Sequence, residues 1–119
     1  MDLVVRFGLV TGERDTRVVV PALEEALSVF FEPNRTPDTY SAYVEPEDVS
    51  LSLRFDWPVE SAFEQACPHV MSVETGKRHN IPALGRVFGQ IAASGRFRAA
   101  MLIDWEEIAI TRGVPEQDG

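Results

Sequence analysis

The chain has 119 residues, of which 45% are hydrophobic and 25% are charged. Both fractions are ordinary for a folded domain, so the composition excludes a disordered chain, a collagen-like repeat and a disulfide scaffold. Eleven Lys and Arg against nineteen Asp and Glu give a net charge of -8, which argues against sequence-independent binding to nucleic acid, since that binding needs cations to neutralise phosphates.

The first part of the chain predicts a β-hairpin followed by a helix. Apolar residues alternate with others across residues 3–10, which indicates a strand. Residues 11–15 have turn chemistry and residues 16–20 are rich in β-branched side chains, so we expect a second strand that pairs with the first. Pro21 then opens a helix that ends by Glu32, because apolar residues after it recur at helical spacing.

The middle of the chain predicts two strands and a second helix. Residues 33–40 contain two prolines and no periodicity, which is typical of a loop, and residues 40–45 form a short strand. Strict alternation across residues 49–57 indicates a half-buried strand in an antiparallel sheet. Pro58 opens a second helix, which the proline after Cys67 should terminate.

The last part of the chain predicts a strand, a helix and two further strands. Residues 69–74 form the first strand, and Pro82 opens a helix with the best apolar periodicity in the chain. Gly95 stands where a left-handed C-terminal cap is expected. Residues 97–103 and 107–112 then form the last two strands.

These elements predict a fold of the α+β class. We expect one domain over residues 1–113, followed by a polar C-terminal tail at 114–119. Helices among predicted hairpins favour a mostly antiparallel sheet of about five strands, with three helices packed on one face.

The common catalytic and cofactor motifs are absent from the sequence. It contains no phosphate-binding P-loop, no dinucleotide fingerprint, no nucleophile elbow and no paired-histidine zinc motif. Cys67, His69 and His79 lack the paired spacing of structural zinc ligands, so we expect no metal and no cofactor. Cys67 and His69 could also act as a nucleophile and its base. The position of Cys67 at a helix C-terminus argues against this pair, because the negative end of the helix dipole disfavours a thiolate.

An acidic stretch from Glu32 to Glu64 predicts a protein-binding surface. It carries eight acidic residues and only Arg35 and Arg54 as cations, and its aromatic side chains would serve as anchors on a basic partner. The candidate binding residues are Tyr40, Tyr43, Glu45, Glu47, Asp48, Trp57 and Trp105.

Two predicted strands end in an Asp-Trp pair and suggest an alternative function. If the strands were neighbours, Asp56 and Asp104 would lie together beside two indoles, where apolar surroundings raise a carboxyl pKa for acid/base catalysis. The structural alternative is that each tryptophan closes the core and each aspartate caps the next segment.

A basic stretch balances the acidic one. Residues 75–103 contain no Asp or Glu, and their cationic side chains would form an anion site, contact an acidic partner, or pair with the chain's own acidic face within one molecule or in a dimer. The anion-binding candidates are Arg78, His79, Arg86, Arg96 and Arg98.

The sequence therefore leaves two functions open. The first is a small acidic module that binds another protein, a basic one, as an inhibitor, immunity-type protein or adaptor; the second is a small enzyme or anion-binding protein. A homo-oligomer is compatible with both. The lone cysteine, the lack of a leader pattern and the lack of a long apolar stretch predict a cytoplasmic protein that binds neither membrane nor nucleic acid.

Overall fold

A computed structural model describes residues 2–44, 48–75 and 81–115 of the chain. Its strands are β1 (Leu3–Leu9), β2 (Glu32–Pro33), β3 (Thr39–Val44), β4 (Val49–Arg54), β5 (His69–Thr75), β6 (Phe97–Ile103) and β7 (Glu106–Ile110). Its helices are α1 (Thr16–Leu27), α2 (Ala62–Ala66) and α3 (Ile81–Ala93).

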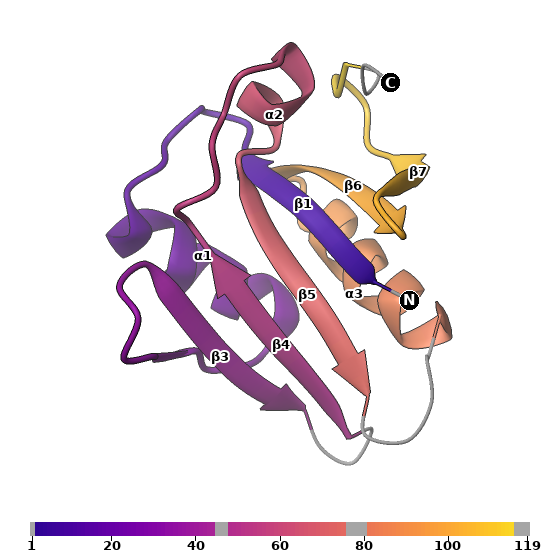
Figure 1. Ribbon diagram of the computed structural model, residues 1–119. Helices are drawn as coiled ribbons and strands as arrows, with labels where there is room; N and C mark the ends of the chain where they lie inside the picture. The colour runs from indigo at the N-terminus through magenta and orange to yellow at the C-terminus, as the bar shows by residue number, and fades with distance from the viewer. Residues whose placement is uncertain (1, 45–47, 76–80, 116–119) are drawn as a thin grey trace.

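The strands form one sheet with the order β2-β3-β4-β5-β1-β6-β7, in which every neighbouring pair is antiparallel. The predicted α+β class is confirmed, with seven described strands where about five were expected. The expected hairpin between residues 3–10 and 16–20 is wrong, because β1 pairs with β5 and β6 and so lies inside the sheet (Figure 1).

The segment predicted as a second strand is the first turn and a half of α1. Asp15 is the N-cap of this helix, and its Oδ1 accepts a hydrogen bond from the Arg17 N–H at 2.9 Å. Pro21 therefore lies inside the helix rather than opening it. The β-branched residues were misleading because burial of one helical stripe outweighs their strand propensity; the buried side chains of α1 are Val19, Val20, Ala22, Leu23 and Leu27.

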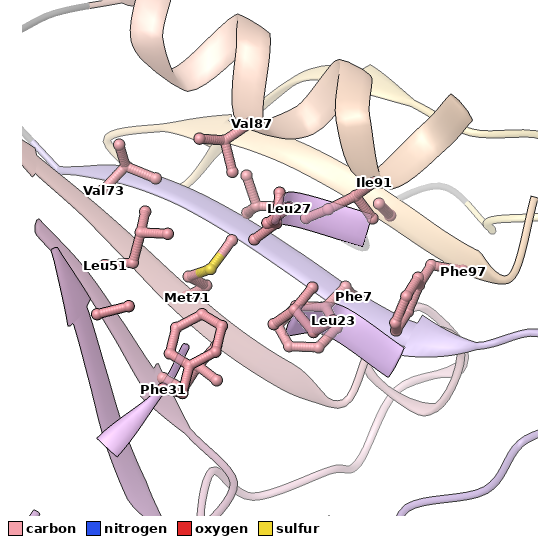
Figure 2. Packing of buried hydrophobic residues seen from close by; sticks show 14 of the residues in the cluster. Phe7, Leu23, Leu27, Phe31, Leu51, Met71, Val73, Val87, Ile91 and Phe97 are labelled. Carbon is pink, nitrogen blue, oxygen red and sulfur yellow. The ribbon is translucent and has the colours of Figure 1, made fainter. Parts of the chain in front are cut away.

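The main core lies between one face of the sheet and the helices α1 and α3. Side chains from β1, β4 and β5 point into it, and Figure 2 shows Phe7, Leu51 and Met71 directed towards the helical layer. Leu23 from α1 and Ile91 from α3 fill the space opposite and are fully buried. This face of the sheet is called the inner face below.

The short helix α2 packs on the opposite, outer face of the sheet, so only two of the three helices share one face. Phe63 of α2 lies with Val4, Val70 and Leu102 in a second apolar cluster, separate from the main core. The helix begins at Ala62 rather than at Pro58, because Ser61 and Glu64 form a capping box there. It ends at Ala66 with Cys67 as its C-cap, next to the proline that was predicted to terminate it.

The remaining strands agree with the predicted ones to within a few residues, except β2, which lies where the sequence predicted the end of a helix and the start of a loop. In β4 the residues alternate between buried and half-buried, as the 49–57 pattern predicts, but the strand ends at Arg54. Gly95 adopts a φ of 71°, the left-handed conformation expected after α3. Val114, the first residue of the expected polar tail, is buried in the outer cluster, and residues 116–119 lie outside the described part of the chain.

Candidate binding face

The outer face of the sheet has an apolar half and a polar half. Over β1, β5 and β6 it is covered by α2, by Trp57 and by the segment that contains Val114. The other half, over β2 to β5, carries mainly serine side chains. Strand alternation explains the difference, because apolar residues of β3 and β4 point inward and leave the serines on the outer face.

The serines come from three neighbouring strands and meet through the register of the sheet. Ser41 of β3 pairs with Ser52 of β4, which in turn pairs with Ser72 of β5. A second row places Tyr43 beside Ser50 and Ser50 beside Glu74. We call this surface the serine face; its residues are Phe30, Glu32, Ser41, Tyr43, Ser50, Ser52, Ser72 and Glu74.

The serine face contains an open depression of about 590 Å³. Its floor is polar, because the hydroxyls of Ser41, Ser50 and Ser52 line it, and Glu32 and Glu74 are exposed at its margins. Among the described residues, no lysine or arginine lines the depression. The surface therefore offers two carboxylates and several hydroxyls, which can both donate and accept hydrogen bonds.

Two aromatic side chains stand at the same surface. Phe30 is 87% exposed and Tyr43 is 53% exposed, and both line the depression. The hydroxyl of Tyr43 donates a hydrogen bond to Asp48 Oδ1, which adds a third carboxylate beside the face. Aromatic side chains with little conformational freedom are the usual anchors of protein interfaces.

The structure separates the two tyrosines that the sequence proposed together. Tyr40 points to the inner face and packs edge-on against Phe55, with ring centroids 5.6 Å apart. Tyr43 is on the outer face, because it stands three positions after Tyr40 and strand residues an odd number of positions apart point to opposite faces. Asp48 lies beside Tyr43, and Glu45 and Glu47 lie outside the described residues.

The two tryptophans meet although their strands are not neighbours. The Trp57 and Trp105 rings lie 5.5 Å apart, and the Arg54 guanidinium lies 5.5 Å from the Trp57 ring centre. Trp105 and Asp104 both have positive φ in the tight turn between β6 and β7. Asp2 holds this turn by accepting the Trp105 indole N–H at 3.1 Å.

The two aspartates do not have the environment that acid/base catalysis requires. Both are exposed. Asp56 pairs with Arg54 at 3.2 Å, and this hydrogen-bonded cation lowers the pKa of Asp56, whereas a general acid needs a raised pKa. Asp104 Oδ1 accepts the backbone N–H of Asp2 at 2.8 Å, so it ties the turn after β6 to the start of β1 rather than capping the segment that follows it.

The described arginines of the basic stretch have three different surroundings. Arg86 lines a small apolar pocket of about 110 Å³ between α3 and the sheet. Arg96 forms an ion pair of 3.3 Å with Glu25 of α1. Arg98 is half-buried on β6, and Arg78 and His79 lie outside the described residues.

Two buried polar residues, Arg6 and His69, were not predicted as binding residues, and His69 was considered only as a base beside Cys67 or as a zinc ligand. Arg6 is 6% exposed on the outer face, where its Nε donates to the Cys67 carbonyl at 3.0 Å and its Nη1 lies 3.5 Å from Glu64 Oε2. Burial lowers the pKa of Arg6, and Glu64 acts in the opposite direction. His69 is 3% exposed on the inner face. The only feature of the sequence that could have indicated their burial is that each lies in a predicted strand of otherwise mainly apolar residues.

Burial also decides the chemistry of Cys67. It raises the pKa of the Cys67 thiol to about 12, so the thiol stays protonated at neutral pH and is a poor nucleophile.

Within the described ranges no three His, Cys, Asp or Glu side chains gather as metal ligands. None of the described helices is long and apolar enough to cross a membrane.

Comparison of the chain with protein families, with curated proteins and with solved structures finds no match.

Proposed function

We propose that this protein is a binding module that holds a basic segment of another protein against the serine face. The observation that carries the proposal is the composition of the depression on that face. Glu32 and Glu74 supply negative charge, no lysine or arginine from the described part of the chain lines the depression, and Phe30 and Tyr43 supply exposed aromatic area. An inhibitor, an immunity-type protein or an adaptor would use such a surface.

Charge complementarity favours a lysine-rich or arginine-rich partner. A net charge of -8 gives the whole molecule a negative field, which attracts basic partners and repels nucleic acid. The carboxylates at the margin would pair with cationic side chains of the partner, while the serine hydroxyls would bond its polar groups. The open shape of the depression fits an extended segment better than an enclosed small molecule.

The proposal is tested by the affinity for a labelled, unstructured peptide of lysine, arginine and leucine, measured by fluorescence anisotropy. Exposed ion pairs are individually weak, but reversal replaces attraction with repulsion, so Glu32→Lys combined with Glu74→Lys should weaken binding about tenfold. Phe30→Ser should weaken it as well, because it removes an aromatic anchor.

The matched control is Glu13→Lys combined with Glu60→Lys, which changes net charge equally at exposed positions away from the serine face. The control variant should bind within about twofold of the unmodified protein. Equal weakening in both double variants would reject the proposed surface, because net charge alone would then explain binding. Absence of binding to the unmodified protein would reject the proposed basic partner.

A further inference from the structure

The pocket between α3 and the inner face of the sheet, called the α3 pocket below, is a second candidate site and is independent of the serine face. It has a volume of about 110 Å³. Figure 2 shows Leu27 of α1, Leu51 of β4 and Val87 of α3 in this part of the core. The apolar side chains that line the pocket are Leu27, Val29, Val44, Val49, Leu51 and Val87.

The polar residues that line the α3 pocket lie together on one helix. Arg86 and Gln90 are four positions apart in α3, so they share one side of it. Both are exposed, whereas Val87 beside them is buried. The pocket is therefore apolar in its depth and polar where it opens, which is the usual character of a small-molecule site.

The charge at the opening of the α3 pocket is positive. Among the described residues, no Asp or Glu lines the pocket. The neighbouring glutamates of α1 have other partners: Glu24 Oε2 accepts the Phe31 N–H at 2.8 Å, and Glu25 pairs with Arg96 at 3.3 Å. The opening therefore favours an anionic group, although the whole chain has a net charge of -8.

The guanidinium of Arg86 suits a carboxylate in particular. It carries five N–H donors in a planar fork, and a carboxylate accepts two of them side by side, so other donors remain for a partner within the protein. The side-chain amide of Gln90 adds a further donor on the same side of α3.

We propose that the α3 pocket binds a short-chain monocarboxylate, with its hydrocarbon tail among the apolar side chains and its carboxylate on Arg86 and Gln90. An apolar cavity of about 150 Å³ holds benzene, so a smaller pocket of about 110 Å³ fits a tail of about four carbons. A dicarboxylate is disfavoured, because its second charge would lie unpaired in the apolar depth.

NMR titration of the isotope-labelled full chain with pentanoate tests the site. The methyl signals of Leu51 and Val87 should shift, with a dissociation constant of about 1 to 10 mM because the ligand is small. The affinity should rise from acetate to pentanoate, since each added carbon buries apolar area, and should level off in longer acids. The uncharged 1-pentanol should bind about fivefold more weakly than pentanoate.

Two variants separate the head group from the tail. Arg86→Gln should weaken pentanoate binding about fivefold, because the carboxylate loses its cation. Its matched control is Arg35→Gln, which makes the same charge change at an exposed position that does not line the pocket, and which should leave the affinity within about twofold. Val44→Phe places a ring in the pocket and should abolish binding of both pentanoate and 1-pentanol.

Three results would overturn the proposal. The first is the absence of methyl shifts at Leu51 and Val87 in the unmodified protein at about 50 mM pentanoate. The second is equal affinity for pentanoate and 1-pentanol, or equal effects of Arg86→Gln and Arg35→Gln, because the site would then not recognise a carboxylate. The third is unchanged binding in a folded Val44→Phe variant, because the tail would then lie elsewhere.

Discussion

His69 lies at the start of β5 with its imidazole between the rings of Phe7 and Phe55, at centroid distances of 5.4 and 4.6 Å. Neither ring nitrogen has a hydrogen-bond partner among the described residues. Burial, with smaller contributions from Arg14 and Arg6, lowers the pKa of His69 to about 4 from its ordinary value of 6.5. The folded protein therefore holds this imidazole in its neutral form.

The buried imidazole predicts a loss of stability in mild acid. The unfolded chain binds a proton on His69 near pH 6.5, whereas the folded chain binds it only near pH 4. The contribution of neutral His69 to the free energy of unfolding is therefore fully present above about pH 6.5. The free energy of unfolding falls by about 3 kcal/mol as the pH drops from there to about 4. Urea unfolding at intervals of pH measures this loss.

His69→Phe is the matched variant for the acid effect. Phenylalanine keeps an aromatic ring between Phe7 and Phe55 and replaces the two unpaired nitrogens with carbon, so the variant has no group at this position that binds a proton in mild acid. Its stability should change little between pH 6.5 and 4. An unaltered acid loss in His69→Phe would assign the effect to other groups.

Gly8 is the second residue whose side chain, or lack of one, determines stability. A Cβ at this position would lie 2.6 Å from the Ala66 carbonyl oxygen and 2.7 Å from Pro68 Cδ. Gly8→Ala should therefore destabilise the protein by about 3 kcal/mol, because backbone must move. Gly85→Ala is the control: a Cβ there meets nothing within 4 Å, so alanine in α3 should stabilise the protein by about 0.5 to 1 kcal/mol.

At the scale of elements, α2 illustrates how a very short helix is stabilised. It has five residues, and the hydroxyl of Ser61 accepts the Glu64 N–H at 3.1 Å while Glu64 Oε1 accepts the Ser61 N–H at 2.9 Å. Too few residues are present for helix propensity to matter. Its caps and the burial of Phe63 therefore hold the helix against the sheet.

The capping box gives a prediction for α2. Ser61→Ala should destabilise the protein by about 1 kcal/mol, because the Glu64 N–H loses its acceptor. Ser61→Thr keeps a hydroxyl and should lose less than half of that. The midpoint of urea unfolding distinguishes the two variants, and equal midpoints would contradict a stabilising role for the cap.

The sequence predicted those elements whose pattern is visible within the element itself. The alternation in β4 and the apolar stripe of α3 depend on neighbours along the chain, and both are confirmed. The prediction of a strand at residues 16–20 was wrong, because five residues are too few to distinguish a strand from a helical turn. The residue that caps the helix, Asp15, lies just outside this segment. The packing of α2 on the outer face of the sheet depends on the order of the strands, which the pattern of apolar residues along the chain does not reveal.

At the scale of the whole molecule, the serine face shows why only part of the candidate site was predictable. Tyr43 and Asp48 were named from the acidic stretch and lie together at the surface. Ser41, Ser52 and Ser72 meet only through the register of three strands, so their neighbourhood was invisible before the fold. The opposite faces of Tyr40 and Tyr43 followed from alternation and could have been predicted.

The acidic character of the molecule predicts that binding of a basic partner depends on salt. The Debye length falls from about 30 Å at 0.01 M salt to about 3 Å at 1 M, so exposed carboxylates lose their attraction. We expect the dissociation constant for a basic peptide to rise steadily over this range, as measured by fluorescence anisotropy. Binding that is unaffected by salt would contradict an electrostatic origin.

The most direct test of the proposed binding face is NMR mapping of the basic peptide on the isotope-labelled protein. If the serine face binds the peptide, the amide shifts concentrate at Ser41, Ser50, Ser52 and Glu74, and an acidic peptide of the same length causes none there. Shifts that concentrate on α1 and α3, or that spread evenly over the surface, would contradict the assignment of function to the serine face.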